Sequence, residues 1–224
     1  MKLLRITLLL VIVIMSVSCG KKPEAEKSEK VYYAATTHAL GAILNELCQG
    51  IGECRVILQP GASPHTYSPV PSDIAASTKA KAVFYADENA DGWAKNLNNK
   101  VLVRMLGMVP DSLLVHFEHV CEHSEGHEEH DHDLEGIDPH FWTDPFTVKH
   151  ILPKLTDTLC SLDPQNAEKY KANSAAFSKK LDALCQRVQK ELAPFKGRAV
   201  FLFHPSFLYL LRYLYLEELY RHSY

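Results

Sequence analysis

The chain has 224 residues, of which 46% are hydrophobic and 23% are charged, and this composition is typical of a folded protein with room for one large domain or two smaller lobes. Its formal net charge is -3, and no basic stripe with interleaved aromatic residues occurs, so we expect no nucleic-acid partner. Histidine is unusually frequent: the chain has twelve, and six of them lie between His116 and His132.

Residues 1–19 have the layout of a cleaved signal peptide, with basic residues before an apolar run that is too short to span a bilayer. Cys19 follows small residues, which predicts a bacterial lipobox and lipid anchoring of Cys19, although Ser16 stands where an aliphatic residue is usual. A simple secretory signal with a chance cysteine is the alternative. Residues 20–30 are polar and predict a flexible tether.

The next part of the chain alternates predicted strands with predicted helices. The expected strands are residues 31–37, 55–58, 82–85 and 112–117, and the expected helices are residues 40–47, a short helix capped by Ser72 and Asp73, and a weak helix at 91–97. Parallel strands need crossover connections, so this alternation predicts an α/β fold with a mostly parallel sheet. We assign residues 31–137 to an N-terminal lobe that includes a histidine-rich loop.

The pattern changes at Asp138, where residues 138–162 begin a predicted second lobe. A helix is expected at 146–162, and a long helix at 163–195 follows the Asp-Pro pair. This long helix would be either a rigid link between two lobes or one arm of a helical hairpin. Residues 199–203 predict a fifth strand and residues 206–218 a helix, within an incomplete C-terminal lobe at 196–224.

Three isolated histidines lie in positions suited to binding. His65 occupies a proline-stiffened loop after a predicted strand, and His204 follows the apolar run at 199–203. His140 lies in a turn that also holds Asp138 and Asp144, two carboxylates able to orient an imidazole. The spacing between the three matches no local zinc-binding pattern, so only the fold would bring them together.

Two motifs, at residues 60–67 and 138–145, closely resemble those of the solute-binding proteins of bacterial zinc and manganese ABC importers, known as cluster A-I. The resemblance runs from about residue 31 to 211. It implies two α/β lobes bridged by one long rigid helix, with a metal bound in the cleft between them. The motif histidines His65 and His140 correspond to metal ligands, and His204 resembles the third ligand position.

The same resemblance implies an extracytoplasmic receptor that captures Zn²⁺ and delivers it to an ABC permease with its ATPase, and that acts as a monomer anchored to the membrane. Imidazole ligands favour zinc, whereas the manganese-binding members carry a carboxylate at the third position. The histidine-rich loop, residues 116–133, also holds seven carboxylates and predicts an accessory zinc collector; an acidic solvated loop is the alternative. Its histidines are His116, His119, His123, His127, His130 and His132.

The family continues beyond the length of this chain and supplies a carboxylate ligand from that region in many members. We therefore expect a truncated or frameshifted product, with a complete but shortened protein as the alternative. Other functions remain open: a stand-alone zinc buffer or adhesin-type surface protein, or a non-functional product. Three histidines would also suit a catalytic zinc, but no general base is evident, so we expect no enzyme.

Overall fold

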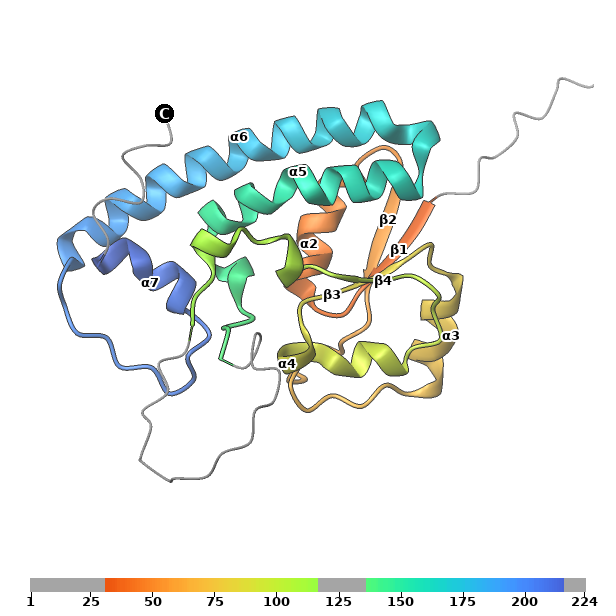
Figure 1. Ribbon diagram of the computed structural model, residues 1–224, viewed down its shortest axis with the longest axis horizontal. Coiled ribbons are helices and arrows are strands. Elements are labelled where there is room, and N and C mark those ends of the chain that lie inside the picture. Colours follow the sequence, from red (N-terminus) through yellow and green to blue (C-terminus); the bar gives the residue numbers. More distant parts are fainter. Residues whose placement is uncertain (1–30, 117–135, 216–224) are drawn as a thin grey trace, which may run out of the picture. The chain divides into compact units, whose positions relative to one another are not determined.

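The computed structural model describes residues 31–116 and 136–215 (Figure 1). The predicted signal peptide, the lipidation site at Cys19, the tether and five of the six histidines of the histidine-rich loop lie outside these residues. None of the helices in the described ranges combines the length and the hydropathy needed to cross a bilayer.

A parallel sheet forms the centre of the fold. Its strands are β1 (Val31–Ala35), β2 (Gly52–Val56), β3 (Val83–Tyr85) and β4 (Leu102–Arg104), in the order β2-β1-β3-β4. All three strand pairings are parallel, as the α/β pattern predicts. It is the only sheet within residues 31–116 and 136–215.

Both faces of the sheet are covered, which explains why its central strands are apolar at consecutive positions. Tyr33 and Ala35 of β1 pack into the larger core with the helices α2, α5 and α6. Ala34 and Val83 face a smaller core on the other side, which includes Leu97. Since neither face meets solvent, alternation of polar and apolar residues is absent from these strands.

The helices that follow β1 and β2 start at local hydrogen bonds between a side chain and the backbone. In α2 (His38–Leu47), the Thr37 side chain accepts a hydrogen bond from the Leu40 amide. α3 (Pro71–Lys79) starts earlier than predicted: its N-cap is Val70, not Ser72 or Asp73, and the Asp73 carboxylate in its first turn accepts from the Val70 amide at 2.9 Å. A short helix, α4 (Glu88–Asp91), and a 3-10 turn (Gly92–Asn96) replace the weak helix expected at 91–97.

The predicted strand at 112–117 is wrong. Its first residues form a 3-10 turn (Asp111–Leu113), and only His116 makes a β-bridge, antiparallel to Ile137. The fourth strand is instead Leu102–Arg104, where the sequence predicts none. It is short and only partly buried, so its hydrophobic pattern is weak.

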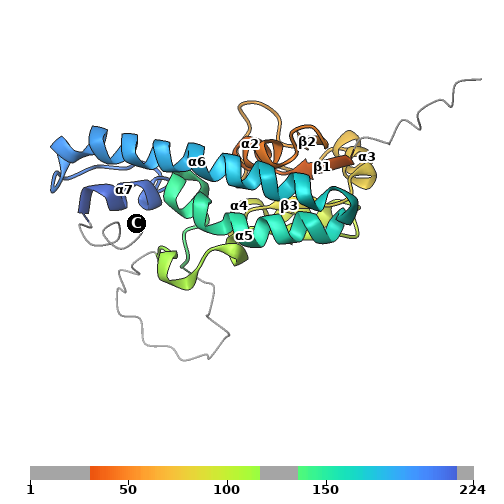
Figure 2. The same ribbon diagram turned by 90° about the horizontal axis from the view of Figure 1, so that it is seen from above.

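The second half of the described chain is helical. α5 (Pro145–Leu162) and α6 (Ala167–Leu192) lie side by side and form the hairpin that the sequence allows, with Ile151, Leu155 and Leu181 buried in one core (Figures 1 and 2). Short 3-10 turns flank α6 on both sides, so residues 164–195 are helical throughout, close to the expected range.

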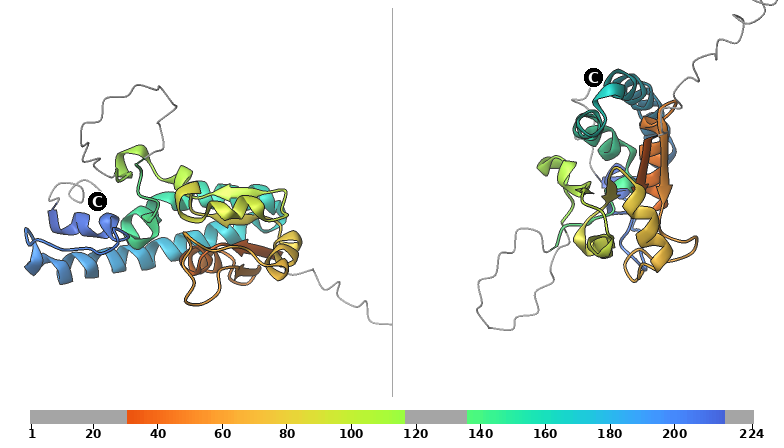
Figure 3. Two further views of the ribbon diagram at one scale, coloured as in Figure 1. Left: turned by 90° about the horizontal axis from the view of Figure 1, so that it is seen from below. Right: turned by 90° about the vertical axis from the view of Figure 1, so that its right-hand side faces the viewer.

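α6 runs from the sheet at one end to α7 (Leu208–Tyr215) at the other (Figures 2 and 3). Near the sheet, the Asn173 amide donates to the Leu47 carbonyl at 2.8 Å and Lys180 forms an ion pair with Glu46 at 2.7 Å. These contacts fix α6 against α2. The helix therefore connects the sheet with the region that carries α7.

The predicted strand at 199–203 is also wrong, because these residues have no regular structure. Phe201 is 82% exposed and Phe203 is 98% exposed, so their apolar side chains do not enter a core. A strand is stable only when its backbone groups pair with a neighbour, and no strand lies beside this segment among the described residues. The division into two lobes stays a prediction.

Candidate metal centre

Three histidines from separate parts of the chain meet at one place. His65 lies in the loop between β2 and α3, His140 precedes a 3-10 turn (Phe141–Thr143) before α5, and His204 lies between α6 and α7. Their ring centroids are 5.2–5.3 Å apart in all three pairs. One nitrogen atom of each lies within 4.8 Å of the other two. The fold thus assembles the three residues that the sequence singled out.

The ring of His65 is oriented by a backbone carbonyl. Its Nδ1 atom lies 3.2 Å from the carbonyl oxygen of Asn89. A carbonyl oxygen only accepts hydrogen bonds, so Nδ1 carries the hydrogen and Nε2 keeps a free lone pair. The loop is held in turn by Trp93, whose indole N–H donates to the Pro64 carbonyl at 2.8 Å.

The ring of His140 is oriented by a carboxylate. Asp138 Oδ1 accepts hydrogen bonds from His140 Nδ1 at 2.6 Å and from the His140 backbone N–H at 2.9 Å. Asp138 is fully buried and His140 is 5% exposed, so this interaction is shielded from water. The bond keeps the hydrogen on Nδ1, where it points to the carboxylate, and leaves a lone pair on Nε2, as in histidines that bind metals.

Asp144, the other carboxylate of this motif, has a different role. It accepts hydrogen bonds from the Phe146 and Thr147 backbone N–H groups and caps α5. Burial raises its pKa despite these bonds. The expectation that Asp144 orients an imidazole is therefore wrong, and only Asp138 does so.

The Nε2 atoms of His65 and His140 lie 3.2 Å apart. With both Nδ1 hydrogens engaged elsewhere, two lone pairs face each other and repel, unless a cation lies between them. In a tetrahedral zinc site with Zn–N bonds of about 2.0–2.1 Å, two ligand nitrogens are about 3.3 Å apart. The observed separation matches this edge of a zinc coordination shell.

His204 reaches the site from a less constrained segment. It is exposed, and its ring contacts those of both other histidines. The segment is tied to α7, where the Gly197 amide donates to the Leu214 carbonyl at 3.1 Å. The position of His204 thus depends on how α7 is held.

Several contributors to the site were not found from the sequence. The Asn89 contact uses a backbone carbonyl, which has no sequence signature. Trp142, whose ring lies 5.3 Å from that of His140, has no role predicted from the sequence. Of the histidine-rich loop, His116 is exposed and lies outside the three-histidine cluster; the other five are not described by the structure.

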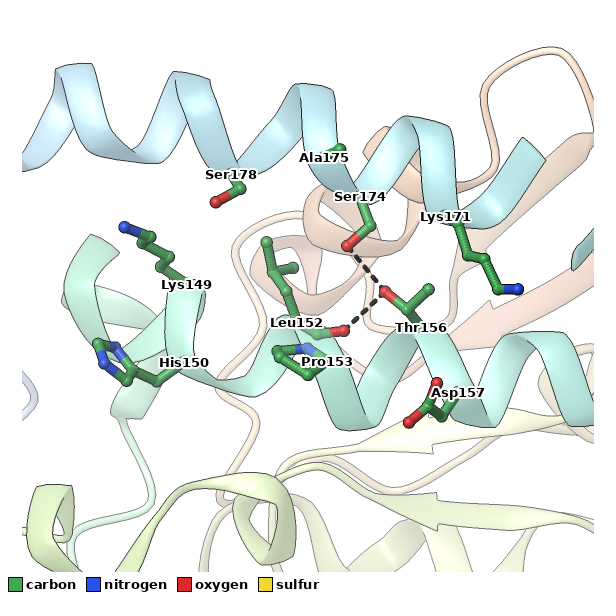
Figure 4. A pocket seen from close by; sticks show the side chains of 10 residues that line it. All are labelled: Lys149, His150, Leu152, Pro153, Thr156, Asp157, Lys171, Ser174, Ala175 and Ser178. Carbon is green, nitrogen blue, oxygen red and sulfur yellow. Dashed lines mark hydrogen bonds between the residues drawn. The ribbon is translucent and has the colours of Figure 1, made fainter. Parts of the chain in front are cut away.

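A separate recess of about 690 Å³ lies between α5 and α6, and none of the three histidines lines it (Figure 4). Its two lysines are already paired, Lys149 with Asp182 and Lys171 with Glu168. The Thr156 and Ser174 hydroxyls in its wall are hydrogen-bonded to each other at 2.8 Å. The recess therefore offers no unpaired lysine to an anionic ligand, and the histidine cluster is the stronger candidate site.

Comparison with known proteins gives one family. The family model described as "Zinc-uptake complex component A periplasmic" matches residues 34–223. The chain is 27% identical over 222 residues to the zinc-binding protein AdcA of Streptococcus pyogenes, with 93% of this chain and 42% of that protein covered. It is 29% identical to the high-affinity zinc uptake system protein ZnuA of Brucella abortus, with 85% and 66% covered. The chain thus spans about two fifths to two thirds of these relatives.

Solved structures agree with this assignment. A zinc-bound deletion mutant of ZnuA superposes with a TM-score of 0.67 at 25% identity, and the match covers 83% of this chain and 67% of the other. The periplasmic zinc-binding protein TroA of Treponema pallidum gives a TM-score of 0.67 at 19% identity, covering 83% and 64%. The second likeness supports the fold alone.

Proposed function

Because this chain belongs to the family of zinc-uptake complex component A, we propose that it is a receptor that captures Zn²⁺ on His65, His140 and His204. One observation carries the proposal. The Nε2 atoms of His65 and His140 face each other at 3.2 Å while their Nδ1 atoms contact a carbonyl and a carboxylate. A bound cation converts the resulting repulsion between lone pairs into two metal–nitrogen bonds.

The ligand chemistry favours zinc as the cargo. Neutral imidazole suits Zn²⁺, whereas Mn²⁺ prefers oxygen ligands such as carboxylate and water. Three imidazoles leave one tetrahedral position for water or a further protein ligand. The buried Asp138 carboxylate adds a negative charge behind His140, which strengthens the ring as a donor to the metal.

We place the protein outside the cytoplasmic membrane, anchored there through Cys19, where it delivers zinc to an ABC permease and its ATPase. Support comes from the signal-like residues 1–19 and from relatives that are named as zinc uptake proteins. The histidine-rich loop, residues 116–133, would collect zinc near the site; its described end, His116, is exposed. A stand-alone zinc buffer using the same three histidines is the alternative.

Zinc binding by the purified chain tests the site. In competition with a chelating dye, we expect tight binding of one Zn²⁺ at the three-histidine site, and its loss in His65→Ala and His140→Ala. His150→Ala is the matched control, because His150 lies on α5 and contacts the Phe146 carbonyl instead of the cluster. Tight binding that persists in both cluster variants would overturn the assignment.

The proposed delivery of zinc to a permease needs a separate test. In a bacterial strain that lacks its native zinc receptor, we expect the chain to restore growth under chelation, and His140→Ala to fail. A chain that binds zinc but restores no growth, although it is exported, would favour the buffer function over import.

A further inference from the structure

Tyr209 of α7 binds two backbone groups, one on each side of the junction where residues 115–116 pair with residues 137–138. Its side chain is fully buried, and its hydroxyl donates a hydrogen bond to the backbone carbonyl of Asp138 at 2.9 Å. The same hydroxyl accepts one from the Val115 backbone N–H at 3.3 Å. Burial raises the pKa of Tyr209 to about 12, so the hydroxyl keeps its proton at neutral pH and remains a donor.

This hydroxyl completes a short antiparallel pairing. The Asp138 N–H donates directly to the Val115 carbonyl at 2.8 Å, and His116 forms a bridge with Ile137. In a regular pair of this kind, the Val115 N–H would return a bond to the Asp138 carbonyl. Here Tyr209 Oη stands between these two groups and relays the bond from one to the other. α7 is therefore hydrogen-bonded to both paired segments through Tyr209.

Arg212, one turn further along α7, reinforces the junction. Its guanidinium lies 4.6 Å from the centre of the Tyr209 ring, within cation–π range, and it also donates to the Leu113 carbonyl. Two side chains of α7 therefore bind the backbone that leads into the pairing at 115–116.

The junction connects two of the three histidines. Asp138, whose carbonyl Tyr209 binds, holds the His140 ring through its carboxylate. His204 lies four residues before the first residue of α7, in a segment without regular structure. The position of α7 against the paired residues Val115 and Asp138 thus determines the distance between His204 and His140.

We propose that Tyr209 is a positioning residue for metal binding, whose hydroxyl sets His204 in register with the Asp138–His140 pair. The inference rests on the proposed zinc site and concerns how that site is held together. A purely structural tyrosine would affect folding stability alone, whereas this one acts on zinc affinity through His204.

A double-mutant cycle tests the inference. We expect Tyr209→Phe, which removes only the hydroxyl, to weaken Zn²⁺ binding about tenfold, the lower end of the range for groups that orient metal ligands. In a His204→Ala background, the same change should cost about twofold or less, because the residue being positioned is gone. Equal losses in the two backgrounds, or no loss in the parent, would overturn the proposal.

The matched control is Tyr170→Phe on α6. Tyr170 is also fully buried, and its hydroxyl bonds to Tyr33 and Asp163, away from the histidine cluster. It should lower stability and leave zinc affinity unchanged. With Co²⁺ as a spectroscopic probe, the visible absorption of Tyr209→Phe should resemble that of His204→Ala, and that of Tyr170→Phe should resemble the parent. A Tyr209→Phe spectrum identical to the parent contradicts the proposal.

Hydrogen exchange on the parent protein gives a measurement that needs no variant to fold. The Val115 N–H, bound to Tyr209, should exchange at least about tenfold more slowly when Zn²⁺ is added, while the Thr36 N–H, bound to Phe84 in the sheet, reports the global stabilisation by zinc. Unchanged exchange at Val115 in a zinc-loaded protein would overturn the positioning role alone. A parent that binds no zinc would overturn the proposed function and this inference together.

Discussion

Asp138 and His140 are two residues apart, and one carboxylate oxygen of Asp138 binds both the backbone N–H and the ring Nδ1 of His140. The sequence brings the two groups close, and the intervening proline and buried surroundings hold the ring in a single orientation. The other oxygen, Asp138 Oδ2, is buried and has no hydrogen-bond partner within residues 31–116 and 136–215. The carboxylate therefore remains in the interior chiefly through its bonds to His140.

Removing the charge of Asp138 should weaken the zinc site while keeping its shape. For Asp138→Asn we expect Zn²⁺ affinity to fall about tenfold or more, since a neutral amide supports the imidazole less than a carboxylate does. Chelator competition measures the change. Asp144→Asn is the control in the same motif: it replaces the oxygen that accepts from Thr147 with an NH2 group, so stability should fall while zinc affinity stays. Equal effects of the two variants on affinity would contradict the distinct roles assigned to the two residues.

Zinc should stabilise the folded chain, because the three histidines come together only in the native state. With free Zn²⁺ at a hundred times the Kd, mass action contributes about 2.7 kcal/mol, which raises Tm by roughly 5–10 °C for a chain of this size. Differential scanning calorimetry before and after addition of a chelator measures the shift. His65→Ala should remove it, and a shift of the same size in that variant would place the stabilising metal elsewhere.

Replacing residues 118–134 with a short Gly-Ser linker removes five histidines of the histidine-rich loop and leaves the three-histidine site intact. We expect the variant to keep one tight Zn²⁺ and to lose weaker binding, because the linker joins the paired residues His116 and Ile137. Equilibrium dialysis across a range of zinc concentrations measures both the tight and the weaker zinc binding. Unchanged total zinc in the variant would argue against a collecting role for the loop.

Asp163 should make the fold sensitive to acid. Burial raises the pKa of Asp163, but hydrogen bonds from Asn166, Lys81 and Tyr170 outweigh burial and leave the pKa below its usual value. A lowered folded-state pKa gives stability that is complete above the unfolded value of about 4 and is lost as the pH falls through the folded pKa.

Asp163→Asn should therefore cost about 2 kcal/mol of unfolding free energy at pH 7, and the difference from the parent should shrink below about pH 4. Urea denaturation at neutral and acidic pH measures both. Asp157→Asn, at an exposed position on α5, should show neither effect. If the variant and the parent differ by the same unfolding free energy at all pH values, the charge of Asp163 is not the cause of the lost stability.

The fold could be predicted from the sequence where the local signal was strong. The strand at 31–35 and the helices at 145–162 and 167–192 follow clear apolar patterns. Residues 199–203 carry an equally strong strand pattern, yet Phe201 and Phe203 stay exposed, because strand formation depends on a neighbouring strand that a sequence pattern does not reveal. The three-residue strand at 102–104 is too short to give a recognisable pattern.

The sequence by itself determined the chemical types at the site: imidazoles at His65, His140 and His204, and a carboxylate two residues from one of them. These are local properties that survive in any conformation. Only the tertiary structure decided that the three rings meet, that the Asn89 carbonyl fixes the His65 ring and that Tyr209 joins α7 to the backbone of Asp138. Such contacts link residues that are far apart in the chain, so their geometry follows from the packing of sheet and helices around one core.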